Sequence, residues 1–239
     1  MVETIVCIPS RFASTRFPGK PLVSIRGKPM IRWVTEAAVA ANIGPVFVAT
    51  DTQLIADKVS DIAIAVITKE FQNGTERCWD VAKKIKPNYI INLQGDSPLI
   101  KPQTLIEINN KLKETTNEKN VVVASKRCEL RETLKDKNVV KCIVKGNKVV
   151  DFTRIYSALK ESTITSVQIH AGVYGFSYRG MEEFVKRERT PRERREQLEQ
   201  LRILGFTGWE FTTVEIDYIP HHIDVAKDVD EVCRLLNHR

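Results

Sequence analysis

Positively charged side chains gather in one loop near the start of the chain, which carries Arg11, Arg16 and Lys20. Arginine binds phosphate through forked hydrogen bonds, and lysine adds a compact positive charge. Ser14 and Gly19 let the backbone approach a ligand closely. Because prolines also restrict this loop, it is more constrained than a surface linker needs to be. We interpret it as a cradle for a polyanion; the alternative is a solvated surface loop.

Two later segments, residues 73–77 and 92–100, fit the loop best if the anion is a nucleoside triphosphate. The common phosphate-binding motifs are absent from the sequence. No GxxxxGK[ST] occurs, and no GxGxxG follows the first predicted strand. A P-loop or a dinucleotide-binding fold is therefore not expected.

The elements that must position these residues alternate between strands and helices. Strands are predicted at 4–8, 46–49, 62–67 and 89–93, and helices at 30–42, 52–60, 75–85 and 102–115. This alternation predicts βαβ units and a mostly parallel sheet. Ligands of such sheets bind beyond the carboxyl ends of the strands. The basic loop, residues 50–51 and residues 94–96 each follow a strand, so we expect them to converge.

The second half of the chain has a different character. Residues 139–144 and 148–152 flank Gly146-Asn147, a turn pair that predicts an antiparallel hairpin. Further strands are predicted at 121–125, 170–176 and 211–216, and helices at 190–204 and 225–236. No repeat or linker separates the halves, so this part is expected to embellish the same domain.

Length, charge and cysteine content narrow the class of protein. The chain has 239 residues, a net charge of +7 and five widely spaced cysteines. No stretch suggests a membrane span or a signal peptide, so we expect a cytoplasmic protein without a membrane partner. The cysteines form no CxxC pair and are interpreted as reduced thiols. The densest basic runs are interleaved with Glu, which favours a solvated helix face over nucleic-acid binding.

Nine segments together resemble the 3-deoxy-manno-octulosonate cytidylyltransferases, also called CMP-KDO synthetases. They are residues 8–22, 49–51, 73–77, 92–100, 138–141, 152–154, 170–174, 198–202 and 223–232. The resemblance implies a Rossmann-like nucleotidyltransferase fold over 1–239. It implies a nucleotide-binding half (1–125), an acid-sugar and dimerisation half (126–220) and a closing segment (221–239). The implied reaction transfers CMP from CTP to an acid sugar and needs Mg2+; the implied assembly is a homodimer.

The resemblance also implies a role for each matched residue. The nucleotide would contact Arg11, Ser14, Arg16, Lys20, Gly74, Thr75 and Arg77. The acid sugar would contact Gln94, Arg154, His170, Tyr174, Glu199 and Gln200. Arg11, Lys20 and Asp96 would be catalytic. Asp96 and Asp224 would hold Mg2+, which prefers carboxylate and phosphate oxygens.

Structural alternatives remain for several of these residues. They are a loop cap for Asp96, a helix cap for Asp224, a helix start for Thr75, a core position for His170 and Tyr174, and a solvated face for Glu199 and Gln200. The triphosphate end is therefore more firmly predicted than the acceptor end.

The chain also departs from the pattern of the family it resembles. Ser97 replaces the usual Glu, Thr153 replaces Ser, and His221-His222-Ile223 replaces a Pro-Gly before Asp224. Neighbouring histidines on an extended chain point in opposite directions, so we interpret both as structural. Most departures lie in the half that would select the sugar. Rival interpretations are a cytidylyltransferase for another acceptor, such as an amino sugar, a different 2-keto-3-deoxy acid or a phosphonate, and a non-catalytic nucleotide-binding protein.

Overall fold

The computed structural model describes residues 2–13, 17–128, 131–155 and 166–237, and for residues 131 and 132 the backbone alone. The strands are β1 (Thr4–Ser10), β2 (Ser24–Ile25), β3 (Lys28–Pro29), β4 (Val46–Thr50), β5 (Ile64–Ile67), β6 (Tyr89–Leu93), β7 (Asn120–Arg127), β8 (Lys141–Lys145), β9 (Lys148–Thr153), β10 (Ser166–Ser177) and β11 (Glu210–Glu215). The α-helices are α1 (Met30–Ala40), α2 (Gln53–Ala56), α3 (Gly74–Ile85), α4 (Pro102–Glu114), α5 (Arg131–Lys135), α6 (Tyr178–Lys186), α7 (Pro191–Glu196) and α8 (Lys227–Asn237). The described 3-10 turns are η1 (Lys20–Leu22) and η3 (Glu199–Arg202).

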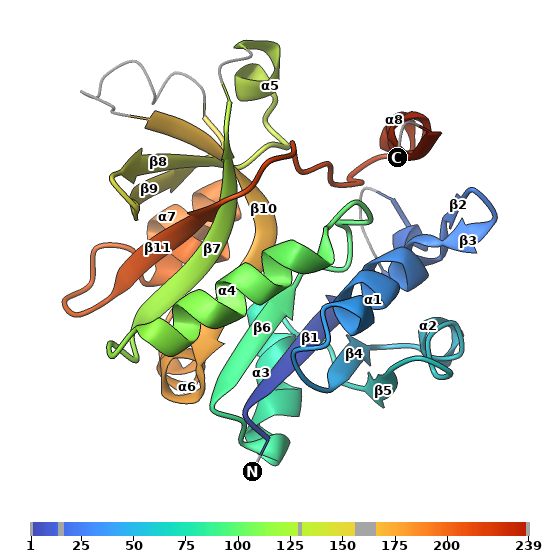
Figure 1. Cartoon of the computed structure of the whole chain (residues 1–239), viewed down its shortest axis with the longest axis horizontal. Coiled ribbons are helices and arrows are strands. Elements are labelled where there is room, and N and C mark those ends of the chain that lie inside the picture. Colours follow the sequence, from blue (N-terminus) through green and yellow to red (C-terminus); the bar gives the residue numbers. More distant parts are fainter. Residues whose placement is uncertain (1, 14–16, 129–130, 156–165, 238–239) are drawn as a thin grey trace.

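The main sheet of the described residues has the strand order β5-β4-β1-β6-β10-β7-β11-β9-β8 (Figure 1). β2 and β3 form a separate antiparallel pair. β1 pairs in parallel with β4 and β6, as the alternation of strands and helices predicts. β10 lies between β6 and β7 and is antiparallel to both. The predicted α/β fold class is confirmed. The sheet is mixed, and its antiparallel part extends beyond the predicted hairpin into the centre.

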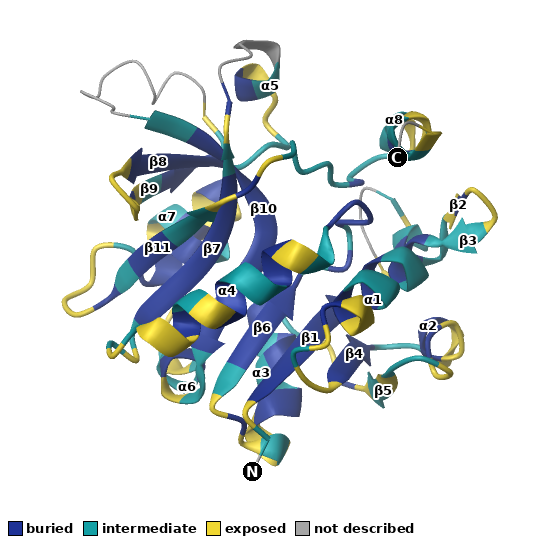
Figure 2. Ribbon diagram, viewed as in Figure 1, coloured by how far each residue is buried: buried dark blue, intermediate teal, exposed yellow. Residues whose placement is uncertain are grey.

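Helices cover both faces of the sheet, and each face has its own apolar core. α1 and α4 pack on one face through Ile31, Val34, Leu105 and Ile108. α3 and α6 pack on the other through side chains such as Phe184. Figure 2 shows the central strands β1, β4, β6, β7 and β10 as almost continuously buried, while the outer sides of the helices are exposed. Strands buried on both faces explain the long apolar runs of the sequence.

Two predicted helices are wrong in extent. The helix predicted over 52–60 ends at Ala56, because the chain tightens there into i→i+3 bonds such as that from Val59 N to Ala56 O. The helix predicted over 190–204 is broken at Gln197, which adopts a left-handed conformation with φ of 53°. The break separates α7 from η3. As a result Leu198 and Leu201 reach the core while Glu199 faces the pocket described below.

The C-terminal segment folds back over the carboxyl ends of β1 and β6. Ile223 N donates to Asp96 O at 3.1 Å, and Ile223 is buried with Ile25, Met30 and Leu99. This contact joins residues that are far apart in the sequence and brings the end of the chain to the edge where the predicted ligand loops meet. Among the described residues, no helix is both long enough and apolar enough to span a membrane.

Candidate active site

A pocket of about 560 Å³ opens at the carboxyl ends of β1 and β6, where the sequence predicts convergence. Of the predicted residues, its wall contains Arg11, Lys20, Gly74, Arg77, Gln94, Asp96, Arg154 and Asp224. An adjoining hollow of about 300 Å³ shares several of these and adds His170, Tyr174, Glu199 and Gln200. Ser14 and Arg16 lie outside the described residues. Thr75 is buried and lines neither hollow.

Lys20 lies between two carboxylates at the floor of the pocket. Its Nζ donates to Asp96 Oδ2 at 2.9 Å and lies 3.8 Å from Asp224 Oδ1. Gly19, with φ of 70°, begins the turn that directs Lys20 inward. Within the first turn of α8, Asp228 accepts hydrogen bonds from the backbone N–H groups of Asp224 and Val225. The Asp224 carboxylate faces Lys20.

The charge of Asp96 is strongly favoured in this setting. Burial opposes ionisation, but the Lys20 ammonium and the His222 imidazole outweigh it and hold the pKa of Asp96 well below its usual range. Burial likewise works against charge on His222, yet its hydrogen bond with Asp96 raises the pKa of the imidazole. The pocket thus holds an ionised Asp96 carboxylate between the Lys20 ammonium and the His222 imidazole.

His222 is a site residue that the sequence interpretation missed. Its Nδ1 lies 2.9 Å from Ser97 Oγ and 3.5 Å from Asp96 Oδ1. Gly172 makes room for the ring, since a Cβ at that position would lie 2.4 Å from His222 Cε1. His222 therefore lines the pocket, which the interpretation of both histidines as structural did not anticipate. A signal was present, because Ser97 and His222, both departures from the family pattern, turn out to contact each other.

The start of α3 forms one wall of the pocket, which we call the nucleotide side because its residues are predicted to contact the nucleotide. Asn73 caps the helix by accepting from Glu76 N at 2.8 Å. Gly74 allows close packing, because a Cβ there would lie 2.7 Å from Gln94 Nε2 and 3.0 Å from Pro9 Cγ. Thr75 supports this wall from behind through its Oγ1, which accepts from Asn92 Nδ2 at 2.8 Å.

Arg77 is the most deeply buried basic group on the nucleotide side. Its Nη1 donates to Thr68 Oγ1 at 2.6 Å, and its Nη2 lies 3.6 Å from Asp51 Oδ2. Burial lowers the pKa of Arg77, which Asp51 partly offsets. Asp51 also accepts from Phe12 N at 2.9 Å and so anchors the basic loop. Arg77 reaches the pocket wall while it holds the loop in place.

We call the wall formed by His170, Tyr174, Glu199 and Gln200 the acceptor side, because these residues are predicted to contact the acid sugar. It carries buried polar atoms that have no hydrogen-bond partner among the described residues. Burial lowers the pKa of His170 to about 3, so its ring is neutral. Nδ1 accepts from Gly172 N, which leaves the proton on Nε2, and Nε2 has no partner among the described residues. Gln200 donates to Tyr174 Oη at 2.6 Å, but its buried Oε1 is also unpartnered within that part of the chain. Such atoms need a ligand or water.

A buried lysine, Lys141, fixes the position of the arginine in this wall. Lys141 is fully buried, and its Nζ donates to the backbone oxygen of Arg154 at 3.0 Å. Arg154 in turn donates to Asn138 O at 2.7 Å. Burial lowers the pKa of Lys141 to about 8, against a raising effect of Asp136. A lysine within the apolar run 139–144 was the sequence signal for this support.

Glu199 offers a test of how the acceptor side affects stability. Burial raises its pKa to about 7 from 4.5, although the Thr75 N–H, which donates to Glu199 Oε2 at 3.3 Å, lowers it. The folded chain therefore retains a proton that the unfolded chain loses, and stability falls as the pH rises from about 4.5 to 7. The free energy of unfolding of Glu199→Gln, relative to that of wild type, should therefore rise by on the order of 2 kcal/mol between pH 5 and pH 8.

Urea unfolding of both proteins at the two pH values measures this change. Glu210→Gln, which removes an exposed glutamate paired with Lys148, is the matched control and should show no such pH-dependent gain. If the free energies of unfolding of Glu199→Gln and wild type differ by the same amount at pH 5 and at pH 8, Glu199 is ionised in the folded chain at both pH values.

Comparison with known proteins identifies relatives over the full chain. A family model described as cytidylyltransferase matches residues 5–207. The 3-deoxy-manno-octulosonate cytidylyltransferase of Rhodopseudomonas palustris (strain BisB18) is 34% identical over 249 aligned residues, which cover 99% of this chain and 98% of that protein. The protein of the same name from Zea mays is 33% identical, with 97% and 80% covered.

Solved structures show the same architecture. The structure of CMP:2-keto-3-deoxy-manno-octonic acid synthetase complexed with CTP matches with a TM-score of 0.86 and 26% identity over 99% of both chains. A 4-diphosphocytidyl-2C-methyl-D-erythritol synthase from Anaerococcus prevotii shares the fold alone, with a TM-score of 0.66 and 13% identity over 98% of this chain and 99% of that one.

The fold and the pocket at its strand ends define a nucleotidyltransferase, an enzyme of the cytidylyl-transferring type. Within that class the chain belongs to the 3-deoxy-manno-octulosonate cytidylyltransferase family. The resemblance seen in the sequence is thereby confirmed.

Proposed function

We propose that the protein transfers CMP from CTP to the anomeric hydroxyl of 3-deoxy-manno-octulosonate or a close acid-sugar relative. The hydroxyl oxygen attacks the α-phosphorus of CTP, the bond to the bridging oxygen breaks, and pyrophosphate leaves. The single observation that supports this best is the Lys20–Asp96–Asp224 group, which lies where the nucleotide side and the acceptor side of the pocket meet.

Each substrate has suitable partners in the pocket. Arg11 and Lys20 supply positive charge for the triphosphate, and phosphoryl transfer depends mainly on such neutralisation and on positioning. We assign the sugar carboxylate to Arg154 and the Nε2–H of His170. We assign the sugar hydroxyls to Glu199 and to Oε1 of Gln200, which has no hydrogen-bond partner among the described residues. Water exclusion by this wall would limit hydrolysis of CTP.

Mg2+ fits the carboxylates of this pocket. Asp96 and Asp224 already face one cation, the Lys20 ammonium. No group of three or more His, Cys, Asp or Glu is poised for a metal among the described residues. This suits Mg2+, which is commonly held by one or two carboxylates plus substrate phosphates. We propose that Asp96 and Asp224 hold the ion with CTP, where it would neutralise charge developing on the phosphates.

The acceptor is tested by pyrophosphate release. Purified protein is mixed with CTP and MgCl2 and with one acceptor at a time: octulosonate, its 8-amino analogue, a different 2-keto-3-deoxy acid and a small phosphonate. We expect release with octulosonate to exceed the background without acceptor at least about tenfold, because acceptor binding aligns the reacting hydroxyl. If pyrophosphate is released only with another acid, that acid is the acceptor.

Two further features belong to this proposal. We propose a homodimer that uses the β8–β9 hairpin, whose Val150 is 50% exposed. A monomeric mass in sedimentation equilibrium would contradict this.

We also propose a reducing compartment, the cytoplasm, because the described cysteines are all free thiols. Recovery of the protein from an oxidising compartment would contradict it.

A further inference from the structure

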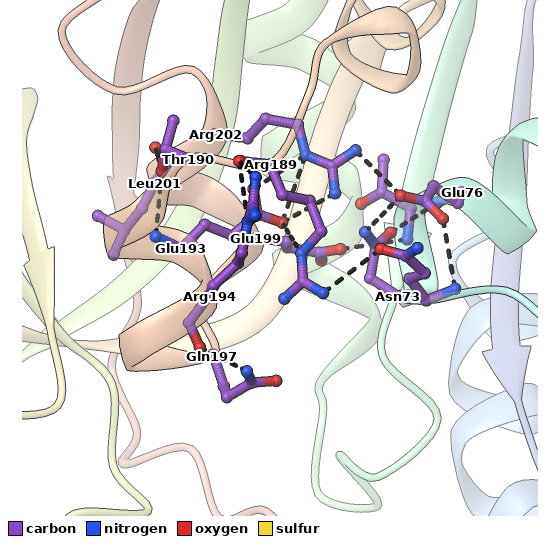
Figure 3. A network of polar contacts seen from close by, with 12 residues as sticks. Asn73, Glu76, Arg189, Thr190, Glu193, Arg194, Gln197, Glu199, Leu201 and Arg202 are labelled. Carbon is purple, nitrogen blue, oxygen red and sulfur yellow. Dashed lines mark hydrogen bonds and ion pairs between the residues drawn. The ribbon is translucent and has the colours of Figure 1, made fainter.

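A buried ion-pair network joins the nucleotide side of the pocket to its acceptor side (Figure 3). Its centre is Arg202, which is 1% exposed. Nη2 of Arg202 donates to Glu193 Oε1 at 2.8 Å, and Nη1 donates to Glu76 Oε1 at 3.0 Å. Glu193 lies in α7, and Glu76 lies in the first turn of α3. One guanidinium therefore spans two elements that are more than a hundred residues apart in the sequence.

A second arginine repeats this connection nearer the surface. Arg189 Nε donates to Glu193 Oε1 at 3.2 Å, and its Nη1 donates to Gln72 Oε1 at 3.3 Å. Gln72 N in turn donates to Glu76 Oε2 at 3.3 Å. Figure 3 shows Arg189 and Arg202 on the same side of Glu76 and Asn73, with Glu193 between the two guanidinium groups. Arg202 and Arg189 therefore both connect Glu193 in α7 to the segment at the start of α3.

Both ends of the network continue directly into the pocket walls. On the α3 side, Glu76 N donates to Asn73 Oδ1 and Asn73 Nδ2 donates to Glu76 Oε1, so the position of Glu76 is that of the helix start, where Gly74 lines the pocket. On the other side, Arg202 ends the 3-10 turn that begins with Glu199. The Thr75 N–H donates to Glu199 across the same junction. A shift of either wall must therefore move the other or break these bonds.

Stability alone is a poor explanation for this network. Arg202 and Glu193 are almost fully removed from water, and Glu76 and Arg189 are partly removed from it. Buried ion pairs often stabilise a fold no better than apolar residues of similar size. Their recognised use is to fix one arrangement among several. Arg202 also lies over the Phe184 ring, with its guanidinium carbon 4.6 Å from the ring centroid, which further fixes its position.

We propose that Arg202 is a positioning residue that couples the two binding sites. Through Glu76 and Glu193 it holds the start of α3 and the Glu199–Arg202 turn at one separation, so nucleotide bound at the first strengthens acid-sugar binding at the second. By linkage the acid sugar strengthens nucleotide binding by the same factor. This inference rests on the proposed function, because it takes CTP and an acid sugar as the two ligands.

Titration calorimetry with a non-reacting nucleotide tests the coupling. The dissociation constant of octulosonate is measured with MgCl2, in the absence and in the presence of saturating α,β-methylene-CTP. For wild type we expect about tenfold tighter binding with the nucleotide present. Glu76→Gln should reduce this to within about twofold, because the amide can still accept from Gln72 N but no longer offers a charge to Arg202.

Arg202→Met is the second variant, and Glu76→Gln carries the test if Arg202→Met does not fold. The matched control is Glu183→Gln, which breaks the partly exposed Lys119–Glu183 ion pair on α6 and should keep the wild-type coupling. Wild-type coupling in Glu76→Gln, or no coupling in wild type, would overturn the inference.

The proposed function is tested separately, by pyrophosphate release from wild type with reactive CTP. If pyrophosphate is released with another acid but not with octulosonate, the calorimetry is run with that acid. Wild-type coupling in Glu76→Gln, or no coupling in wild type, would then overturn the inference in the same way. Loss of coupling with pyrophosphate release still measurable in Glu76→Gln is the result we expect.

Discussion

Asp96→Asn is expected to reduce kcat about a thousandfold or more while the affinity for CTP changes by less than about threefold. The carboxylate is partly buried beside Lys20 and His222, and it is our first ligand for the ion on the triphosphate. The amide keeps the shape of the side chain but cannot neutralise a metal ion. Lys20, released from its ion pair, remains free to contact phosphate, so nucleotide binding should survive.

Steady-state kinetics and equilibrium binding of CTP, each at saturating MgCl2, measure the two quantities. Asp217→Asn is the matched control, because Asp217 is an exposed aspartate whose only role visible here is an ion pair with Lys101. It should retain wild-type kcat. A kcat of Asp96→Asn within tenfold of wild type would remove Asp96 from the reacting centre.

Lys20→Met should lower kcat/KM by about a hundredfold or more and weaken CTP binding together with turnover. Unlike Asp96, Lys20 contributes charge to the triphosphate in the ground state as well as in the transition state. Its removal also leaves Asp96 and Asp224 facing each other without a cation, which repels the incoming phosphates.

The matched control is Lys148→Met, which breaks the surface ion pair with Glu210. Kinetics of both variants across CTP concentrations separate KM from kcat. Wild-type CTP affinity in Lys20→Met would show that the basic loop holds the phosphates without this residue, and would leave Arg11 as the principal phosphate ligand.

The triphosphate end was predictable from sequence because it depends on local signals. An apolar strand, a constrained basic loop and short polar segments after two further strands are each legible in a few neighbouring residues. Their convergence then follows from the geometry of parallel strands. β6 even occupies the predicted bounds, Tyr89–Leu93, and Asp96 follows it as expected.

The acceptor end was less predictable because long-range contacts form it. The break at Gln197 depends on a left-handed conformation of a residue other than Gly, which the sequence pattern does not reveal. His222 becomes a site residue only when the closing segment reaches Ser97. Arg202 was visible within a matched motif, but nothing local indicates that it reaches Glu76 in α3.

The antiparallel centre of the sheet illustrates the same limit. β10 was predicted as a strand over 170–176, yet its twelve residues pair with β6, β7 and β8. Strand existence follows from β-propensity, whereas strand order depends on which edges remain unpaired when the chain returns. That order is what places His170 and Tyr174 beside Gln94 and the carboxylates.

The most direct test of the central claim is a 31P NMR measurement of the products formed from CTP and octulosonate with MgCl2. The account predicts a new phosphodiester resonance and pyrophosphate in equal amounts with wild type, and neither with Asp96→Asn. Pyrophosphate without the phosphodiester would mean that water, rather than the sugar, attacks CTP. Unchanged CTP under these conditions would contradict CMP transfer to this acceptor.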